Sequence, residues 1–253
     1  MLTRVIKIGG RVQADPRLPD AIAKAWRDSN GALCLVHGGG DEISTLQRAL
    51  GHEPTFSGGR RITAPHDLDV LRMALSGSSN KRLVAALLTA GVPALGLSGE
   101  DGALITATRA TPATLGHVGT PSSVRVSLLH ALLREGYLPV ISPVARSAAD
   151  GAPLNVNGDD AASALAIALA ASDLLLVADV PGVLEAGSVV ASLDIDAARA
   201  MIAAGSAGGG MAAKLDAAIH AAQSNVPSVR IGGLDAITDR HAGTMITPVQ
   251  VPA

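Results

Sequence analysis

Residues Val5–Gly10 read VIKIGG, an aliphatic run with a lysine at its centre and two glycines directly after it. The β-branched residues on either side of Lys7 predict a buried strand over Arg4–Ile8. A lysine ammonium is almost never fully buried unless an anion meets it. The stretch therefore predicts a strand that delivers Lys7 to an anion.

The same pattern, a short aliphatic run followed by a longer Ala- and Leu-rich segment, continues along the chain. The predicted strands are Arg4–Ile8, Ala32–Val36, Ala94–Leu97, Leu138–Ser142, Leu174–Val177 and Ser228–Ile231. The predicted helices are Leu18–Asp28, Glu42–Leu50, His66–Leu75, Lys81–Ala90, Ser127–Glu135, Ala161–Ala170, Ile195–Ala204 and Met211–Gln223. Gly51–Ile62 and Leu104–Arg125 have weaker helical signals and are predicted to form hairpins or loops. This alternation predicts an α/β sandwich around a mostly parallel sheet, with a soft boundary near Asp150.

The composition argues against several classes of function. A chain of 253 residues with 48% hydrophobic and 17% charged residues is typical of a soluble globular protein. The net charge of −2 and the single Trp, Tyr and Phe argue against a nucleic-acid partner. The longest apolar stretch, Ala161–Ala171, is shorter than the roughly 20 residues of a membrane span. Cys34 is the only cysteine, so neither a disulfide framework nor a thiolate metal site is expected, and the cytoplasm is the predicted location.

Glycines follow two of the predicted strands. Gly9 and Gly10 follow the first strand, and His37–Gly40 follow the second, just before a predicted helix. Ligands of parallel sheets bind beyond the carboxyl ends of the strands, where glycines let the backbone approach and free N–H groups attract anionic oxygens. Two such loops side by side would form a phosphate cradle. Lys214, which follows three glycines at the start of another predicted helix, suggests a second anion site by the same reasoning.

The familiar nucleotide-binding motifs do not occur in the sequence. A P-loop needs Gly before its lysine and Ser or Thr after it, but Lys214 lies between Ala213 and Leu215. A dinucleotide fingerprint that began at Gly38 would need a glycine where Ile43 stands. The histidines lack the spacing of metal ligands, so no metal site built from protein side chains is predicted.

A polar run, NVNGDD at residues 155–160, stands directly before the most apolar predicted helix. One interpretation is a helix cap, in which Asp159 or Asp160 accepts hydrogen bonds from the first turn. A cap alone does not explain Asn155 and Asn157. Their amides point to the same side of an extended segment, where both could meet one ligand.

Eight motifs in chain order together point to a family. They are KIGG (7–10), HGGG (37–40), GRRIT (59–63), GLSGEDG (96–102), GHVG (116–119), NVNGDD (155–160), DVPGVL (179–184) and GGMAAK (209–214). This set spans essentially the whole chain and closely resembles the N-acetylglutamate kinases of the amino acid kinase family. The resemblance implies an α/β fold, an open three-layer αβα sandwich around a mostly parallel central sheet. It also implies one kinase domain over residues 1–253, in which residues 1–150 bind the acyl amino acid and form the dimer and residues 151–253 bind ATP.

The implied reaction is ATP-dependent phosphorylation of the side-chain carboxylate of N-acetyl-L-glutamate to N-acetyl-L-glutamyl 5-phosphate, in arginine biosynthesis. A carboxylate with an intrinsic pKa of about 4.3 is already ionised at neutral pH, so this phosphotransferase needs no general base. By resemblance, Lys7 and Lys214 approach the phosphoryl group and Asp159 holds both ammonium groups. The resemblance also implies that backbone N–H groups line the path of the transferred group. They belong to Gly9, Gly10, Gly39 and Gly40, of which Gly10 and Gly40 are counted as catalytic.

The resemblance also implies which residues bind the substrates. Gly39 and Gly40 contact the acceptor, Arg61 would hold its α-carboxylate through a bidentate pair, and Asn155 would reach the acetamido region. Arg60 is expected to be a solvated surface charge, and the segment 116–119 resembles a lid over the acceptor. Mg2+ is expected to enter bound to ATP. The residues that match the family's ATP-binding segments are Asp179, Val180, Pro181, Gly182, Val183, Leu184, Ser206, Ala207 and Gly208.

Three rival functions remain open from the sequence. A kinase of N-acetyl- or carrier-linked 2-aminoadipate, in lysine biosynthesis, would differ by one methylene, which is worth only about 1 to 3 kcal/mol. Glutamate 5-kinase, aspartokinase and carbamate kinase share the fold, but neither an appended regulatory domain nor their substrate motifs are recognised here. A non-catalytic sensor of nucleotide or amino acid is the third. The joint presence of Lys7, Lys214 and Asp159 argues against a sensor, because a binder does not need both lysines and their organiser.

The resemblance carries an expectation about assembly as well. The chain starts almost at its first strand, without the N-terminal helix that links dimers into hexamers in arginine-inhibited members, so an arginine-insensitive homodimer is expected. The predicted helices His66–Leu75 and Lys81–Ala90 would form the dimer contacts, although an apolar helix face is by default part of the core.

Overall fold

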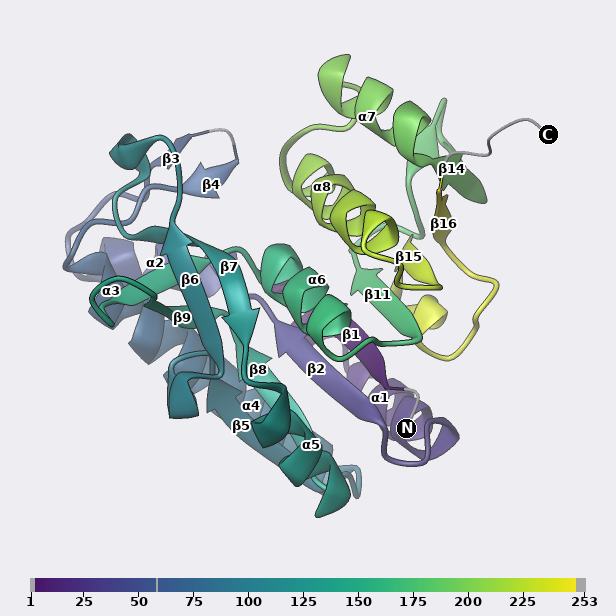
Figure 1. Cartoon of the computed structure of the whole chain (residues 1–253), viewed down its shortest axis with the longest axis horizontal. Helices are drawn as coiled ribbons and strands as arrows, with labels where there is room; N and C mark the ends of the chain where they lie inside the picture. The colour runs from purple at the N-terminus through teal and green to yellow at the C-terminus, as the bar shows by residue number, and fades with distance from the viewer. Residues whose placement is uncertain (1–2, 58, 249–253) are drawn as a thin grey trace.

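The computed structural model describes residues 3–57 and 59–248. Its central sheet has eight strands in the order β14-β16-β15-β11-β1-β2-β8-β5 (Figure 1). Neighbouring strands are parallel except for the pair β15 and β16. The strands are β1 Arg4–Ile8, β2 Leu33–His37, β5 Ala94–Ser98, β8 Leu138–Ser142, β11 Asp173–Val177, β14 Ser192–Asp194, β15 Val229–Gly232 and β16 Thr244–Thr247. Because β1 pairs with both β2 and β11, strands from the two halves of the chain form one continuous sheet.

Helices cover both faces of this sheet, which confirms the predicted three-layer α/β sandwich (Figure 1). They are α1 Leu18–Asp28, α2 Gly40–Ala49, α3 Asp67–Leu71, α4 Asn80–Thr89, α5 Val126–Arg134, α6 Gly158–Ala168, α7 Ile195–Ala203 and α8 Gly209–Gln223. Successive strand residues face opposite sides. Val5 therefore packs in the core beneath α6 and α8, whereas Ile6 and Ile8 pack in the core beneath α1 and α4. Lys7 shares the face of Val5 and so points toward α6.

One helical prediction is wrong. The two separate helices predicted at His66–Leu75 and Lys81–Ala90 form one uninterrupted helical stretch, because the π-helical segment Arg72–Ser79 joins α3 directly to α4. Tertiary contacts hold this segment in place. Ser79 Oγ donates to Gln13 Oε1 at 2.9 Å, and the side chain of Asn80 donates to Val140 O at 2.9 Å.

The segments predicted as hairpins or loops do contain hairpins. Strands β6 Ile105–Arg109 and β7 Val118–Val124 pair antiparallel and close a small barrel with β9 Val144–Ser147 and β10 Pro153–Val156. Two short hairpins, β3 Phe56–Ser57 with β4 Arg60–Arg61 and β12 Leu184–Glu185 with β13 Ser188–Val189, complete the strands. Of the segment 116–119, expected to be a lid, Val118 and Gly119 are buried and pair with β10 in the barrel.

Candidate active site

The register of the sheet brings the glycine-rich loops together. Ile8, the last residue of β1, lies opposite His37 on β2 and Val177 on β11, so all three strands end at one edge of the sheet. A Cβ atom built on Gly10 would lie 3.3 Å from the Cα of Gly39. The two loops therefore pack against each other as the sequence predicted, and a side chain on Gly10 would force them apart.

Beside these loops, Lys7, Asp159 and Lys214 form a buried charge cluster, called here the lysine cluster. Lys7 Nζ lies 2.9 Å from Asp159 Oδ1, and Lys214 Nζ lies 3.2 Å from Asp159 Oδ2. The three residues come from β1, the first turn of α6 and α8, and each side chain is at most 11% exposed. Gly158 makes room for the cluster, because a Cβ there would lie 3.2 Å from Lys7 Cε.

Electrostatics leave this cluster with one excess positive charge. Burial raises the pKa of Asp159, but Lys7 and Lys214 together outweigh burial, so the net shift is downward and the carboxylate is ionised. Burial and the neighbouring Lys7 lower the pKa of Lys214 to about 8. Two ammonium groups share one carboxylate, and a second anion would stabilise the arrangement.

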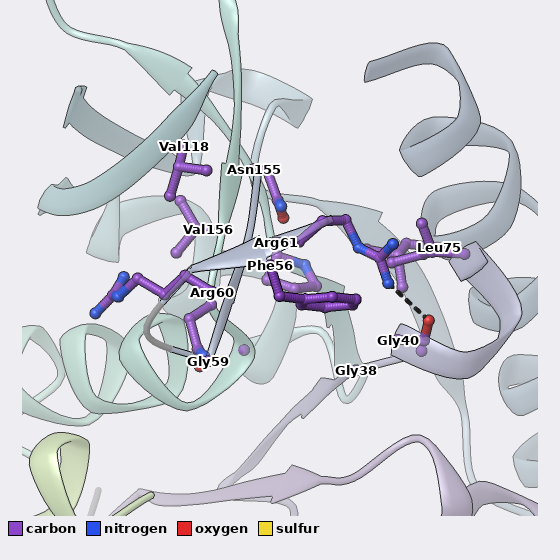
Figure 2. Close-up of a pocket in the computed structure, with 15 residues that line it drawn as sticks. Gly38, Gly40, Phe56, Gly59, Arg60, Arg61, Leu75, Val118, Asn155 and Val156 are labelled. Carbon is purple, nitrogen blue, oxygen red and sulfur yellow. Dashed lines mark hydrogen bonds between the residues drawn. The ribbon is translucent and has the colours of Figure 1, made fainter. Parts of the chain in front are cut away.

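A first cavity of about 160 Å3 is lined by Arg61 and by Gly158, the glycine that packs against Lys7 (Figure 2). The Arg61 guanidinium donates to Gln47 Oε1, and at 2.9 Å to both Gly40 O and Ser44 Oγ. Within residues 3–57 and 59–248, no carboxylate lies within 4.0 Å of it. Burial lowers the pKa of Arg61, yet an arginine stays charged in proteins. A buried cation surrounded by neutral acceptors is a site for an anionic ligand.

Both asparagines of the NVNGDD run line this first cavity, but their roles differ. The side chain of Asn155 donates to Thr63 Oγ1 at 3.0 Å and leaves its amide oxygen free for a ligand within the described structure. The side chain of Asn157 accepts from the backbone N–H of Asp159 at 2.7 Å, so Asn157 is the helix cap. The alternative of a cap at Asp159 or Asp160 is therefore wrong, since helix α6 begins before them.

A second correction concerns Arg60. It was expected to be a solvated surface charge, but its side chain is 35% exposed and lines the first cavity. Arg60 Nη2 lies 3.0 Å from Asp160 Oδ2, and the Asp160 side chain is only 16% exposed.

A second, larger cavity of about 470 Å3 borders the lysine cluster. Lys7 and Lys214 line it together with Gly9, Gly10, Asp179 and Val180, all of them expected from the sequence to face the phosphates or the nucleotide. Gly210 and Met211 also line it and were not predicted.

Other residues of the predicted nucleotide set lie differently. Val183 and Ala207 are buried in the hydrophobic core, and Gly182 packs closely against Val189 and Thr244. Leu184 is 40% exposed, in the β12–β13 hairpin. Pro181, Ser206 and Gly208 are exposed, and the lining of the second cavity includes none of these residues.

Sequence reasoning missed the residues that shape the second glycine loop. Burial lowers the pKa of His37 to about 4, so the imidazole is neutral at pH 7. Its Nδ1 donates to Gly38 O at 2.9 Å and its Nε2 accepts from Asn80 at 3.1 Å. Gln13 donates to the same Gly38 oxygen at 2.7 Å. No sequence motif marks these contacts, because the partners come from distant parts of the chain.

Comparisons with known proteins agree with this geometry. The model of the amino acid kinase family matches residues 3–233. The chain belongs to the amino acid kinase family. It is 43% identical over 245 residues to the acetylglutamate kinase of Chloroflexus aurantiacus, covering 96% of both chains. It is 36% identical to the acetylglutamate kinase of Methanoculleus marisnigri, covering 97% of this chain and 93% of that one.

Among solved structures, smu.665 from Streptococcus mutans superimposes with a TM-score of 0.88 and 30% identity over 97% of this chain and 98% of that one. The sandwich is thus the amino acid kinase fold that the eight motifs indicated.

Proposed function

We propose that the protein transfers the γ-phosphoryl group of ATP to the side-chain carboxylate of N-acetyl-L-glutamate, as an acetylglutamate kinase of arginine biosynthesis. Membership of the amino acid kinase family and full-length identity of about 40% to acetylglutamate kinases support this activity. The observation that carries it is the lysine cluster, which has one excess positive charge, lines the second cavity and packs against Gly158 in the wall of the first. Both the transferred group and its acceptor are anions, so a shared cationic centre is what this chemistry needs.

The first cavity is the proposed acceptor site. Arg61 would take the α-carboxylate in exchange for its neutral neighbours, and the free amide oxygen of Asn155 would accept from the acetamido N–H. Gly39 and Gly40 line the same cavity beside Arg61, close to where the acceptor side chain would run toward Lys7.

The second cavity, about three times larger, is the proposed ATP site. Asp179 and Val180 would contact the nucleotide, with Lys7 and Lys214 at its phosphate end. We propose accordingly that residues 1–150 carry acceptor binding and residues 151–253 carry nucleotide binding, with β1 and its lysine at the join.

In the proposed reaction, a carboxylate oxygen attacks the γ-phosphorus. The bond from that phosphorus to the bridging oxygen breaks, and ADP leaves with the electron pair. Lys7 and Lys214 would stabilise the charge on the transferred group, and Asp159 would hold them apart from each other. Removing one such cation typically costs on the order of 3 kcal/mol of transition-state stabilisation. N–H groups of Gly10 and Gly40 would donate along the path.

Mg2+ is proposed to arrive with ATP. No group of three or more His, Cys, Asp or Glu side chains within residues 3–57 and 59–248 is arranged to hold a metal ion. Mg2+ is commonly bound through substrate phosphate oxygens and water, and we propose that it is bound in this way here.

The test is hydroxylamine trapping of the acyl phosphate formed from ATP and one of four acids at matched concentrations. The acids are N-acetylglutamate, N-acetyl-2-aminoadipate, glutamate and aspartate. Strong preference for N-acetylglutamate is the expected result. Preference for the longer acid would move the protein to lysine biosynthesis, and no turnover with any acid would favour a non-catalytic sensor.

We also propose a cytoplasmic homodimer. Met73 and Leu88, on the helical stretch expected to form the contact, are 49% and 54% exposed. Within residues 3–57 and 59–248, no helix is long and apolar enough to cross a membrane. Light scattering of the purified protein gives the mass of the assembly directly.

A further inference from the structure

We infer that the ion pair of Arg60 and Asp160 is a positioning device that fastens the β3–β4 hairpin to the amino end of α6, and so fixes Arg61 relative to Asp159. This inference rests on the proposed function, because it concerns how the acceptor site is held against the lysine cluster. It adds a role for two residues that do not contact the reacting atoms in the proposed mode of binding, one of which, Arg60, lines the acceptor cavity.

The sequence places the two arginines of the hairpin back to back. Arg60 and Arg61 are neighbours in β4, so their side chains leave the strand in opposite directions. Figure 2 shows Arg61 reaching toward Gly40, while Arg60 extends the other way. Both arginines line the proposed acceptor cavity, and Arg60 also reaches the helix that carries Asp159.

The helical side of the contact is equally direct. Asp160 follows Asp159 in the first turn of α6, and its carboxylate lies 3.0 Å from the guanidinium of Arg60. Asp160 supplies the only carboxylate within 4.0 Å of this guanidinium among residues 3–57 and 59–248. Arg60 Nη1 and Asp160 Oδ2 are both buried without a hydrogen-bond partner there, so the contact is an ion pair. Loss of Asp160 would leave a half-buried cation without an anion, which is costly.

The hairpin also lies close to α8, the helix that carries Lys214. A Cβ atom on Gly59 would lie 3.7 Å from the carbonyl oxygen of Gly209, the first residue of α8. The hairpin is therefore ion-paired to the amino end of α6, which carries Asp159, and lies near the amino end of α8, which carries Lys214. Positioned in this way, Arg61 would keep a fixed distance from the cluster that stabilises the transferred phosphoryl group.

The test is a double-mutant cycle of Arg60→Gln and Asp160→Asn, with KM for N-acetylglutamate, KM for ATP and kcat measured for each protein. Each single variant is expected to raise KM for N-acetylglutamate about tenfold, with KM for ATP unchanged. The double variant should be no worse than either single one, because the pair acts as a unit. Arg60→Lys should recover most of the loss, since it restores a cation opposite Asp160.

Two controls keep the outcomes distinct. Arg199→Gln removes an arginine from an exposed pair with Asp196 on α7 and should leave all three constants unchanged. Binding of N-acetylglutamate to Arg60→Gln, measured by calorimetry with the melting temperature beside it, separates positioning from unfolding. Unchanged KM in both single variants, or additive losses in the double variant, would overturn the inference. Absence of turnover in the wild type would overturn the proposed function instead.

Discussion

Two buried clusters of the same charge composition stand at opposite ends of the central strands. At the carboxyl ends, Lys7 and Lys214 flank Asp159. At the amino ends, Arg4 and Arg230 flank Asp173, in what is called here the arginine cluster. Arg4 and Asp173 are the first residues of β1 and β11 and pair directly in the sheet.

The two clusters differ in what takes up the excess charge. In the arginine cluster, Arg4 donates to Ile237 O at 3.2 Å, and Arg230 donates to the carbonyl oxygens of Asp239 and Ala242, each at 3.2 Å. The forked guanidinium suits several fixed acceptors at once. The lysine cluster instead lines a cavity beside the glycine loops. The same set of charges is therefore hydrogen-bonded to backbone carbonyl oxygens at one end, and at the other end it lines a cavity in which we propose that an anion binds.

The largest expected effect is a loss of folding stability when the arginine cluster loses its carboxylate. Asp173→Asn would leave two buried guanidinium groups without their carboxylate, which typically costs about 3 to 5 kcal/mol. Urea unfolding should show this loss, while kcat of the folded fraction stays at the wild-type value. A variant as stable as the wild type would show that hydrogen bonds to the carbonyl oxygens are enough to stabilise the two buried guanidinium groups.

Arg61 sharpens the comparison, because it is a buried cation with only neutral protein partners. Arg61→Lys keeps the charge but loses the bidentate geometry, so KM for N-acetylglutamate should rise roughly tenfold or more. KM for ATP should not change. Steady-state kinetics with each substrate varied in turn distinguish the two, and an equal rise in both constants would argue against an acceptor site.

A smaller effect follows from the titration of Lys214. Arg4 and Arg230, in the arginine cluster, stay protonated and cannot titrate in this way. The pKa of Lys214 is lowered to about 8, so its ammonium form and the favourable charge decline as the pH rises through that value. The kcat/KM for ATP should fall about fourfold between pH 7 and pH 8.5, since that ratio reports the free enzyme. Lys214→Arg should flatten this decline, and a wild-type profile level to pH 9 would contradict the assignment.

The sequence itself marked Lys7, whereas the grouping of Lys7 with Asp159 and Lys214 was implied by the family resemblance, and the arginine cluster was not predicted. Lys7 interrupts an aliphatic strand and precedes two glycines, so its burial and its need for an anion are both local signals. Arg4 and Asp173 are 169 residues apart in the sequence, and no local sequence pattern predicts that they pair. The same limit explains why Arg60 was predicted to be a solvated surface charge, because its partner Asp160 comes from a different half of the chain.

Other differences between prediction and structure arise where tertiary contacts override local preference. The strand β1, the strand β8 and the helix α1 match the predicted bounds, because their apolar periodicity alone defines them. The π-helical junction between α3 and α4 depends on buried contacts of Ser79 and Asn80, which no periodicity reveals.

The measurement that tests the central claim most directly compares Lys7→Met with Arg4→Met, which remove one buried cation each from the two ends of β1. Both proteins would be assayed for kcat by hydroxylamine trapping and for melting temperature. Lys7→Met should lose on the order of 100-fold in kcat and keep its melting temperature. Arg4→Met should melt earlier and keep its kcat. Turnover left intact in Lys7→Met would contradict the role of the lysine cluster in phosphoryl transfer.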